Sequence, residues 1–354
     1  LKMCGIIVYF TDPKAHISVV GGIHTALTML QHRGQDACGI TTCDGNQILT
    51  VKDNGLVSEV FNQNNLSKLV GYYGIGHVRY PTAGSPDSKE AQPFYTNFPY
   101  GIALAHNGNL INCTELRKKL LCSLRCINTS SDSELLLNVF AEELEKRIDR
   151  SCAAEGKVPM PSVETIFDAV HATMAQVTGG YAVAILIKGV GVVAFRDPFG
   201  IRPLCFGTKC DASGRIVEFA AASESVAVES LGIDRQRDVG AGEVVFVDMA
   251  MQMHTHVDAL AQPLRPCIFE YVYLARPDSV MDNISVYEAR VQMGVRLAAR
   301  VRRLRVKETG ERVHVVDEGD EGYEASLPKL EDLVDVVMAV PDTSRHTALS
   351  IATT

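Results

Sequence analysis

Short apolar runs rich in β-branched residues recur along this chain, and they constrain its fold more than any other feature. Residues 5–10, 74–80 and 101–106 have the length and composition of buried strands. Further runs of this kind follow Gly179-Gly180, at residues 182–187, 190–195, 203–206, 216–221 and 243–247. The runs form two sets, with helical patterns between and outside them. This arrangement predicts an α+β fold of two packed sheets sandwiched by helices, rather than a doubly wound parallel sheet.

Two helices carry recognisable end signals. Apolar residues recur at helical spacing over 16–30, and Gly34 follows, a residue that readily adopts the left-handed conformation found at helix ends. Ser131 and Glu134 precede another run at helical spacing and fit a capping box, with Ser131 as the N-cap. The sequence therefore predicts that one helix ends near Gly34 and that another begins after Ser131. A third helical pattern covers 163–177.

A change of character after Gln262 marks a domain boundary. Pro263 and Pro266 interrupt regular structure there, so we expect one domain over 4–260 and a second over 261–354. In the second domain the sequence predicts a long helix, a charged loop, a strand and a final helix, over 284–305, 307–324, 333–340 and 347–352 respectively. The chain stops inside the last helical pattern, so we expect the second domain to be incomplete.

Composition limits the kinds of partner. The net charge of −8 and the lack of a basic stripe argue against nucleic-acid binding. No apolar run reaches the ~20 residues that span a bilayer, and the head of the chain does not resemble a signal peptide, so we expect no membrane association. The ten cysteines are dispersed without a CxxC pair, which is typical of free thiols in a reducing compartment. We therefore predict a cytoplasmic protein.

Met3-Cys4-Gly5 places a cysteine directly behind a methionine at the head of an apolar run. If Met3 is the initiator and is removed, Cys4 carries a free α-amine beside its thiol, and one residue then supplies both a nucleophile and a base. Leu1 and Lys2 are either a reading-frame artefact or the remnant of a propeptide, and the first is the expectation. The position of Cys4 in the sequence is also compatible with an inert structural cysteine.

Amide hydrolysis through a thiol further needs oxyanion donors and a clamp for the substrate. The side-chain amide of Asn107 and the backbone N–H of Gly108 could converge on one oxyanion, although an Asn-Gly hairpin turn is the plainer interpretation of this dipeptide. Arg79 and Asp132 could hold the α-carboxylate and the α-ammonium group of an amino acid. A surface ion pair and a helix cap are their plainer interpretations.

An ordered set of motifs carries a resemblance to a known family. The motifs lie at residues 4–6, 30–37, 76–84, 90–94, 104–110, 131–134, 195–204, 222–225 and 269–279. Each motif is weak by itself, but together they cover most of residues 4–305. The set closely resembles the glutamine phosphoribosylpyrophosphate amidotransferases, or amidophosphoribosyltransferases, which are class II glutamine amidotransferases with an N-terminal nucleophile.

This resemblance implies a four-layer αββα sandwich of the N-terminal-nucleophile hydrolase type, followed by the start of an α/β phosphoribosyltransferase domain. It also implies roles for six residues. The catalytic residues would be Cys4 as the nucleophile and Asn107 and Gly108 as the oxyanion hole, and the glutamine-binding residues would be Arg79, Asp132 and Arg33.

The activity that the resemblance implies is the first committed step of de novo purine (IMP) biosynthesis. Phosphoribosyl pyrophosphate, glutamine and water would give phosphoribosylamine, glutamate and pyrophosphate, in a homo-oligomer inhibited by purine nucleotides. We expect this chain to keep only the glutaminase half-reaction. Two alternatives stay open: a glucosamine-6-phosphate-type amidotransferase, and a non-catalytic glutamine-binding or assembly module in which Cys4 is blocked.

The resemblance also raises the question of metals. Thr343 matches a position that the family associates with the Mg²⁺ bound to its ribosyl substrate, but no acid-pair loop follows it in this chain. Since Mg²⁺ is usually held by carboxylates and substrate phosphates, we expect Thr343 to serve only if the rest of a transferase half is supplied. Cys267 stands where some members have an iron–sulfur ligand, and a cluster cannot be assigned from the sequence.

Overall fold

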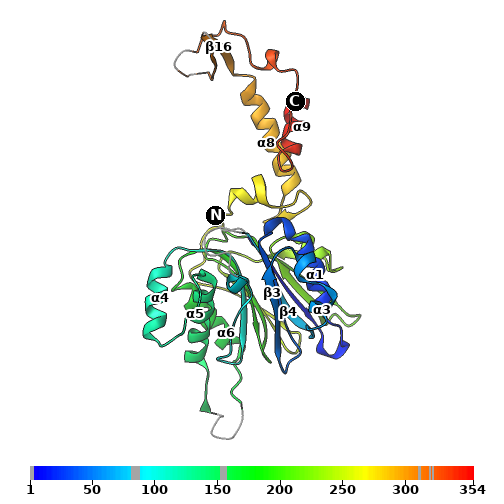
Figure 1. Cartoon of the computed structure of the whole chain (residues 1–354), viewed down its shortest axis with the longest axis vertical. Helices are drawn as coiled ribbons and strands as arrows, with labels where there is room; N and C mark the ends of the chain where they lie inside the picture. The colour runs from blue at the N-terminus through cyan, green and yellow to red at the C-terminus, as the bar shows by residue number, and fades with distance from the viewer. Residues whose placement is uncertain (1–3, 81–87, 152–157, 310–311, 319, 321–322) are drawn as a thin grey trace. The chain divides into compact units, whose positions relative to one another are not determined.

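The structure is a computed structural model that describes residues 4–80, 88–151, 158–309, 312–318, 320 and 323–354 (Figure 1). The chain forms two compact units. The first comprises Leu1–Cys267 with Met281–Asn283, and the second comprises Ile268–Val280 with Ile284–Thr354. The division after Cys267 lies a few residues beyond the boundary expected between 260 and 261. Residues 1–3, and with them the expectation about the start of the chain, lie outside the described residues.

Two antiparallel sheets form the centre of the first unit. In the described residues, the seven-stranded sheet has the order β11-β9-β10-β1-β4-β2-β3, and the six-stranded sheet has the order β13-β12-β8-β7-β6-β5. The first sheet comprises β1 (Cys4–Thr11), β2 (Ala37–Cys43), β3 (Ile48–Asn54), β4 (Tyr73–Arg79), β9 (Cys205–Cys210), β10 (Ile216–Ala222) and β11 (Arg235–Asp238). The second comprises β5 (Phe94–Thr96), β6 (Ile102–Leu110), β7 (Gly179–Ile187), β8 (Gly191–Arg196), β12 (Glu243–Asp248) and β13 (Met253–Val257).

Helices cover the outer face of each sheet (Figure 1). The helices on the seven-stranded sheet are α1 (Val20–Met29), α2 (Val57–Val60), α3 (Gln63–Leu66) and α7 (Ser225–Glu229). Those on the six-stranded sheet are α4 (Cys113–Cys122), α5 (Asp132–Arg147) and α6 (Val163–Met174). One apolar cluster lies between the sheets, and one lies between each sheet and its helices. These three cores give four layers, so the predicted α+β sandwich is confirmed.

Gly34 shows a difference from the sequence prediction. Helix α1 ends at Met29, and a 3₁₀ turn, η2 (Gln31–Arg33), follows it. Gly34 has φ of −165°, which is extended and not left-handed. Glycine is required there for another reason, because a Cβ would lie 2.6 Å from the main chain of Arg79. Close packing against β4, and not a helix-ending conformation, explains this residue.

The start of α5 is predicted only in part. Ser131 is the N-cap, and its side chain accepts a hydrogen bond from the backbone N–H of Ser133. The Glu134 carboxylate does not complete a reciprocal capping box. It accepts hydrogen bonds from the backbone N–H groups of Asn128 and Thr129, at 2.9 and 2.7 Å. The Glu134 carboxylate therefore binds the loop before the helix, and not the backbone N–H of the N-cap residue as the sequence pattern predicted.

The second unit contains less regular structure. Its elements, together with two bordering strands, are the π-helix η5 (Glu270–Leu274), β14 (Val280–Met281), β15 (Ile284–Ser285), α8 (Val286–Val301), β16 (Arg305–Thr309), β17 (Arg312–Val316), η6 (Glu331–Leu333) and α9 (Arg345–Thr353). The long helix and the final helix are confirmed. The expected loop over 307–324 instead contains part of an antiparallel hairpin, β16 with β17. The expected strand over 333–340 is not formed, since no strand among the described residues pairs with this segment.

None of the helices in the described part of the chain is both long enough and apolar enough to cross a membrane.

Candidate active site

Cys4 begins β1 and lines a small polar hollow. It is only 5% exposed, and its Cα lies opposite Arg79 in the β1–β4 pairing. Its backbone nitrogen donates to Oδ1 of Asn107 at 3.2 Å, and its carbonyl oxygen accepts from Nε of Arg33 at 3.0 Å. Side chains from β6 and η2 therefore fix the main chain of Cys4 on both sides.

The hollow gathers residues from segments that are far apart in the chain. Its lining comes from the head of β1, the end of β4, the segment around η3 (Ser88–Glu90), strand β6 and the start of α5. The lining residues are Cys4, Arg79, Tyr80, Glu90, Gln92, His106, Gly108, Ser131, Asp132 and Ser133. Four of the six site residues predicted from sequence are among them. Asn107 and Arg33 lie beside Cys4 but do not line the hollow.

Asn107 is buried inside strand β6, opposite Ala182 of β7, so the hairpin-turn interpretation is wrong. Its Oδ1 accepts hydrogen bonds from the Cys4 nitrogen and from Nη2 of Arg202, each at 3.2 Å. Among the described residues, its buried Nδ2 has no hydrogen-bond partner. A buried amide without a partner is costly, by about 1–3 kcal/mol, and its presence next to a thiol needs an explanation.

Gly108 follows Asn107 in β6 and lines the hollow. Its φ of +154° is accessible mainly to glycine, and a Cβ would lie 2.2 Å from the carbonyl oxygen of Gly180. The close approach of β7 therefore excludes every side chain at this position. Gly108 therefore contributes only main-chain atoms to the lining of the hollow.

Arg79 and Asp132 are both buried, at 9% and 3% exposure, so neither takes part in a surface ion pair. The Arg79 guanidinium pairs with Asp36 at 3.1 Å and with Glu90 at 3.2 Å. Oδ2 of Asp132 accepts from the backbone N–H of Leu110 at 3.0 Å. Asp132 is the first residue of α5 and not its N-cap, so the helix-cap interpretation is also wrong.

Arg33 lies close to Cys4, but its guanidinium faces the main chain and not the hollow. The side chain is fully buried, donates to the Cys4 carbonyl oxygen and pairs with Glu224. His32 contacts the same Glu224 oxygen at 2.7 Å. This geometry differs from the direct glutamine contact that the resemblance implied, because the guanidinium is engaged by the Cys4 carbonyl oxygen and by Glu224. A glutamine-binding role for Arg33 stays a prediction.

The surroundings of the thiol act on it in opposite directions. Burial raises the pKa of the Cys4 thiol, while a hydrogen bond from the Tyr80 backbone and the charge of Arg202 act to lower it. Arg79 adds to the lowering, and the nearby Asp132 carboxylate opposes it. Because burial is the largest effect, the pKa of Cys4 lies above its ordinary value and the sulfur is a thiol at neutral pH.

Sequence reasoning missed several residues of the site. Oε1 of Gln92 accepts from the His106 backbone N–H at 2.8 Å, and Nδ1 of His106 lies 3.0 Å from Oγ of Ser133. Glu90 links Arg79 to Ser130. All of these residues except Ser130 fall within the motifs that carried the family resemblance. The motifs could therefore have indicated these residues, but their spacing in the sequence does not predict a function for any of them.

The residues expected at metals do not form a metal site among the residues described. Thr343 adjoins Asp342, whose carboxylate pairs with Arg345 at 2.7 Å. In the described part of the chain, no group of three or more histidine, cysteine, aspartate or glutamate side chains is arranged to hold a metal ion. Cys267 is a free, partly buried thiol. A role for Thr343 at Mg²⁺ stays a prediction, and an iron–sulfur cluster stays unassigned.

Comparison with known proteins agrees with this geometry. Residues 82–229, within the first unit, match the family described as glutamine amidotransferase domain. The amidophosphoribosyltransferases of Pseudomonas aeruginosa and Escherichia coli are each 47% identical, and the matches cover 99% of this chain and 62% of each relative. The solved glutamine phosphoribosylpyrophosphate amidotransferase from B. subtilis, complexed with ADP and GMP, matches with a TM-score of 0.73 at 28% identity, over 99% of this chain and 64% of that one.

Over 99% of its length the chain is therefore similar to the amidophosphoribosyltransferases. It spans about 62% of the length of these curated relatives.

Proposed function

We propose that the first unit is a glutaminase in which Cys4 is the nucleophile. The observation that supports this most directly is the Asn107 amide. Two donors hold its oxygen, and among the described residues its buried nitrogen has no hydrogen-bond partner. An unpaired donor beside a thiol is what a developing oxyanion requires, because the hydrogen bond then forms in the transition state and not in the ground state.

The reaction follows from the groups at the head of β1. With Cys4 as the first residue, its α-amine accepts the thiol proton, and the sulfur attacks the side-chain amide carbon of glutamine. The carbonyl oxygen becomes an oxyanion that accepts from Nδ2 of Asn107 and from the Gly108 N–H. The amine returns its proton to the leaving nitrogen, and ammonia departs. Water then cleaves the thioester, which releases glutamate and restores the Cys4 thiol.

Arg79 and Asp132 would hold the α-carboxylate and α-ammonium groups of glutamine. Both line the hollow with Cys4, and both are buried. The ion pairs of Arg79 with Asp36 and Glu90 engage two of the five guanidinium N–H groups, so the same side chain can bind a further carboxylate. These existing partners fix the guanidinium before substrate arrives, which lowers the entropy cost of binding.

For the whole protein we propose the family activity, the first committed step of purine synthesis. Ammonia would react with phosphoribosyl pyrophosphate to give phosphoribosylamine and pyrophosphate. The glutaminase domain would cover 4–260, with transferase residues over 261–354. Mg²⁺, with Thr343 contributing, would act only when the rest of the transferase is supplied.

The B. subtilis relative is complexed with ADP and GMP, and another solved relative, at 29% identity, is described as an allosteric regulatory enzyme of purine biosynthesis. Both support feedback by purine nucleotides, and we retain a cytoplasmic homo-oligomer as part of the proposal.

The test uses protein translated from Met3, with removal of Met3 verified by N-terminal sequencing. We expect this protein to release glutamate from glutamine, and Cys4→Ala to abolish that release. Cys122→Ser is the matched control, because Cys122 is an exposed thiol on α4 and its loss should leave the rate unchanged. Glutamate release that survives Cys4→Ala would contradict the proposal. Mature protein that retains Leu1 would favour the non-catalytic binding module instead.

A further inference from the structure

The turn that joins β8 to β9 is built around a buried carboxylate. Oδ1 of Asp197 accepts from the backbone N–H of Phe199 at 2.9 Å, and Oδ2 accepts from that of Ile201 at 2.9 Å. The same Oδ2 accepts from the Tyr181 N–H of β7 at 3.0 Å. Asp197 is fully buried. One side chain thus fixes the course of the turn and ties it to the neighbouring strand.

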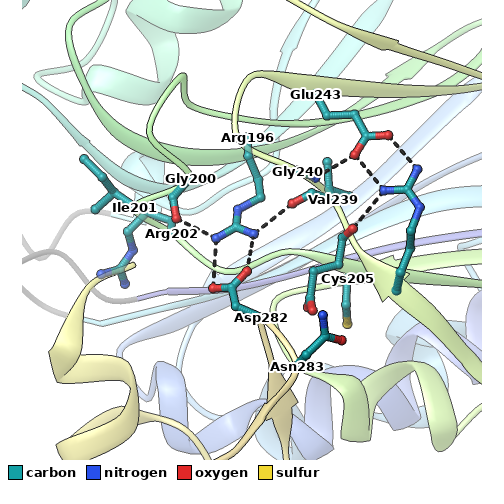
Figure 2. Close-up of polar contacts among 12 residues, drawn as sticks. Arg196, Gly200, Ile201, Arg202, Cys205, Val239, Gly240, Glu243, Asp282 and Asn283 are labelled. Atoms are coloured by element: carbon teal, nitrogen blue, oxygen red, sulfur yellow. Dashed lines mark hydrogen bonds and ion pairs between the residues drawn. The ribbon is translucent and has the colours of Figure 1, made fainter. Parts of the chain in front are cut away.

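The Arg196 side chain also holds the turn (Figure 2). Nη2 of Arg196 donates to the carbonyl oxygen of Gly200 at 2.5 Å, and Nη1 donates to that of Val239 at 2.8 Å. Asp282 neutralises this guanidinium at 2.8 Å. Gly200 has φ of +61°, which favours glycine at this bend. The segment that leads to Arg202 is therefore fixed before any substrate binds.

Arg202 extends from the end of this turn to Asn107. It is 3% exposed, and its Nη2 donates to Oδ1 of Asn107 at 3.2 Å. The Cys4 nitrogen donates to the same oxygen. If the amide were flipped, its NH₂ group would face two donors and no acceptor. The two donors therefore determine which end of the Asn107 amide is left for another partner.

Of the two donors to the Asn107 oxygen, the Cys4 nitrogen changes its protonation state during the proposed reaction and the Arg202 guanidinium does not. The Cys4 nitrogen exchanges a proton with the thiol and the leaving group in the proposed mechanism, so its hydrogen bonding changes within each turnover. A guanidinium keeps its charge and its donors at every stage, because it does not deprotonate in proteins. Arg202 is thus the donor that can hold Asn107 throughout the cycle.

We propose that Arg202 is a positioning residue of the glutaminase reaction, which holds the Asn107 amide with Nδ2 directed to the oxyanion. This inference rests on the proposed glutaminase function. Arg202 acts through Asn107 and touches neither glutamine nor the reacting carbon. Its loss therefore lowers kcat and leaves the KM for glutamine almost unchanged.

The charge of Arg202 has a second consequence at the thiol. It acts to lower the pKa of Cys4 against the effect of burial. Replacement by a neutral side chain should shift the pH profile of Cys4 alkylation by iodoacetamide to higher pH, and Arg202→Lys should largely preserve the profile. This readout needs no turnover, and a purely structural role for Arg202 would not produce it.

The experiment compares Arg202→Met, Arg202→Lys, Asn107→Ala and the double variant Arg202→Met/Asn107→Ala in protein that begins at Cys4. We expect Arg202→Met to lower kcat by roughly 10- to 100-fold with KM within about 3-fold, since removal of a whole oxyanion donor costs about 10²–10³. Arg202→Lys should restore part of kcat. The matched control is Arg215→Met, which removes a surface arginine paired with Asp12 and should change neither constant.

The double variant decides whether Arg202 acts through Asn107. If it does, the loss in the double variant is close to that of Asn107→Ala alone, because neighbours that act as a unit are not additive. Multiplied losses, or an unchanged kcat in Arg202→Met, would overturn the inference. If Arg202→Met does not fold, the same double-variant comparison is made with Arg202→Lys in place of Arg202→Met, and it tests the inference in the same way. Failure of the glutaminase proposal looks different, because the parent protein itself would then release no glutamate.

Discussion

Two strands of the seven-stranded sheet begin with a buried cysteine, and of these two cysteines only Cys4 lines the polar hollow. Cys4 begins β1 and Cys205 begins β9. Both are at most 5% exposed, and burial raises the pKa of both thiols. Burial and position at a strand end therefore do not distinguish them.

The difference lies in what surrounds each sulfur. Cys205 packs in the apolar cluster between the sheet and its helices, and its thiol donates to the carbonyl oxygen of Ala222. Besides burial, the largest influence on its pKa is the Asp238 carboxylate, which raises it further. Cys4 instead lines a polar hollow, where Arg202 and Arg79 oppose burial. A nucleophile needs cationic groups and unpaired donors, not only a secluded thiol.

The largest expected effect separates the two cysteines directly. Cys4→Ala should abolish glutamate release with little change in stability. Cys205→Ala should keep activity within about 3-fold but lower the free energy of unfolding by about 1–2 kcal/mol, because it leaves a small cavity in a packed cluster. Paired measurements of kcat and urea unfolding check this dissociation. Similar losses of activity in both variants would remove the distinction.

The next largest effect concerns the oxyanion donor. Asn107→Ala should lower kcat by about 10²–10³, equivalent to about 3–4 kcal/mol of transition-state stabilisation, because Nδ2 would no longer meet the developing charge. The KM for glutamine should change little. Steady-state kinetics measure both constants, with Asn109→Ala as the control in the same strand. A raised KM with unchanged kcat would place Asn107 in binding and not in catalysis.

A smaller effect is expected at the substrate clamp. Asp132→Asn retains an acceptor for the Leu110 N–H but removes the charge that would pair with the α-ammonium group. We expect the KM for glutamine to rise by about 10- to 100-fold, since buried charged pairs contribute a few kcal/mol. The control substrate is a glutamine analogue without the α-amino group, for which wild type and variant should not differ.

The smallest effect is a pH dependence of stability near the site. His77 of β4 is fully buried, and burial lowers its pKa to about 3 from an ordinary value of 6.5. The unfolded chain therefore binds a proton below pH 6.5 that the folded chain does not bind until about pH 3. The contribution of His77 to the free energy of unfolding is fully present above pH 6.5. It is lost as the pH falls, by roughly 2 kcal/mol between pH 7 and 5.

His77→Leu should reduce that acid loss. Urea unfolding at pH 7 and pH 5 measures it, and exposed His16 offers a control, His16→Leu, that should leave the pH dependence unchanged. An identical acid loss in wild type and His77→Leu would show that the pKa of His77 is the same in the folded and unfolded chains, contrary to the effect of its burial. Because Cys205 lies at another strand, Cys205→Ala should not alter this dependence.

The fold was largely predictable because its signals are local. Apolar β-branched runs, helical periodicity and the Ser131 cap each depend on residues close in sequence, and they gave the two-sheet sandwich. The predictions that failed depend on distant partners. The segment 333–340 has strand composition, but no strand in the described residues pairs with it. Gly34 was assigned to a helix end, whereas the main chain of Arg79 requires it.

The sequence predicted a set of candidate site residues, whose roles stay predictions, but it did not predict their geometry. The sequence by itself determined which residue types were present: a cysteine behind a methionine, an Asn-Gly pair, and motifs that resemble those of the amidophosphoribosyltransferases. Only the tertiary structure decided that Arg33 lies behind Cys4, that Asn107 stands in a strand, and that Arg202 holds its amide oxygen. The physical reason is distance along the chain. The Cys4–Asn107 contact joins residues 103 apart, and no local propensity encodes such a contact.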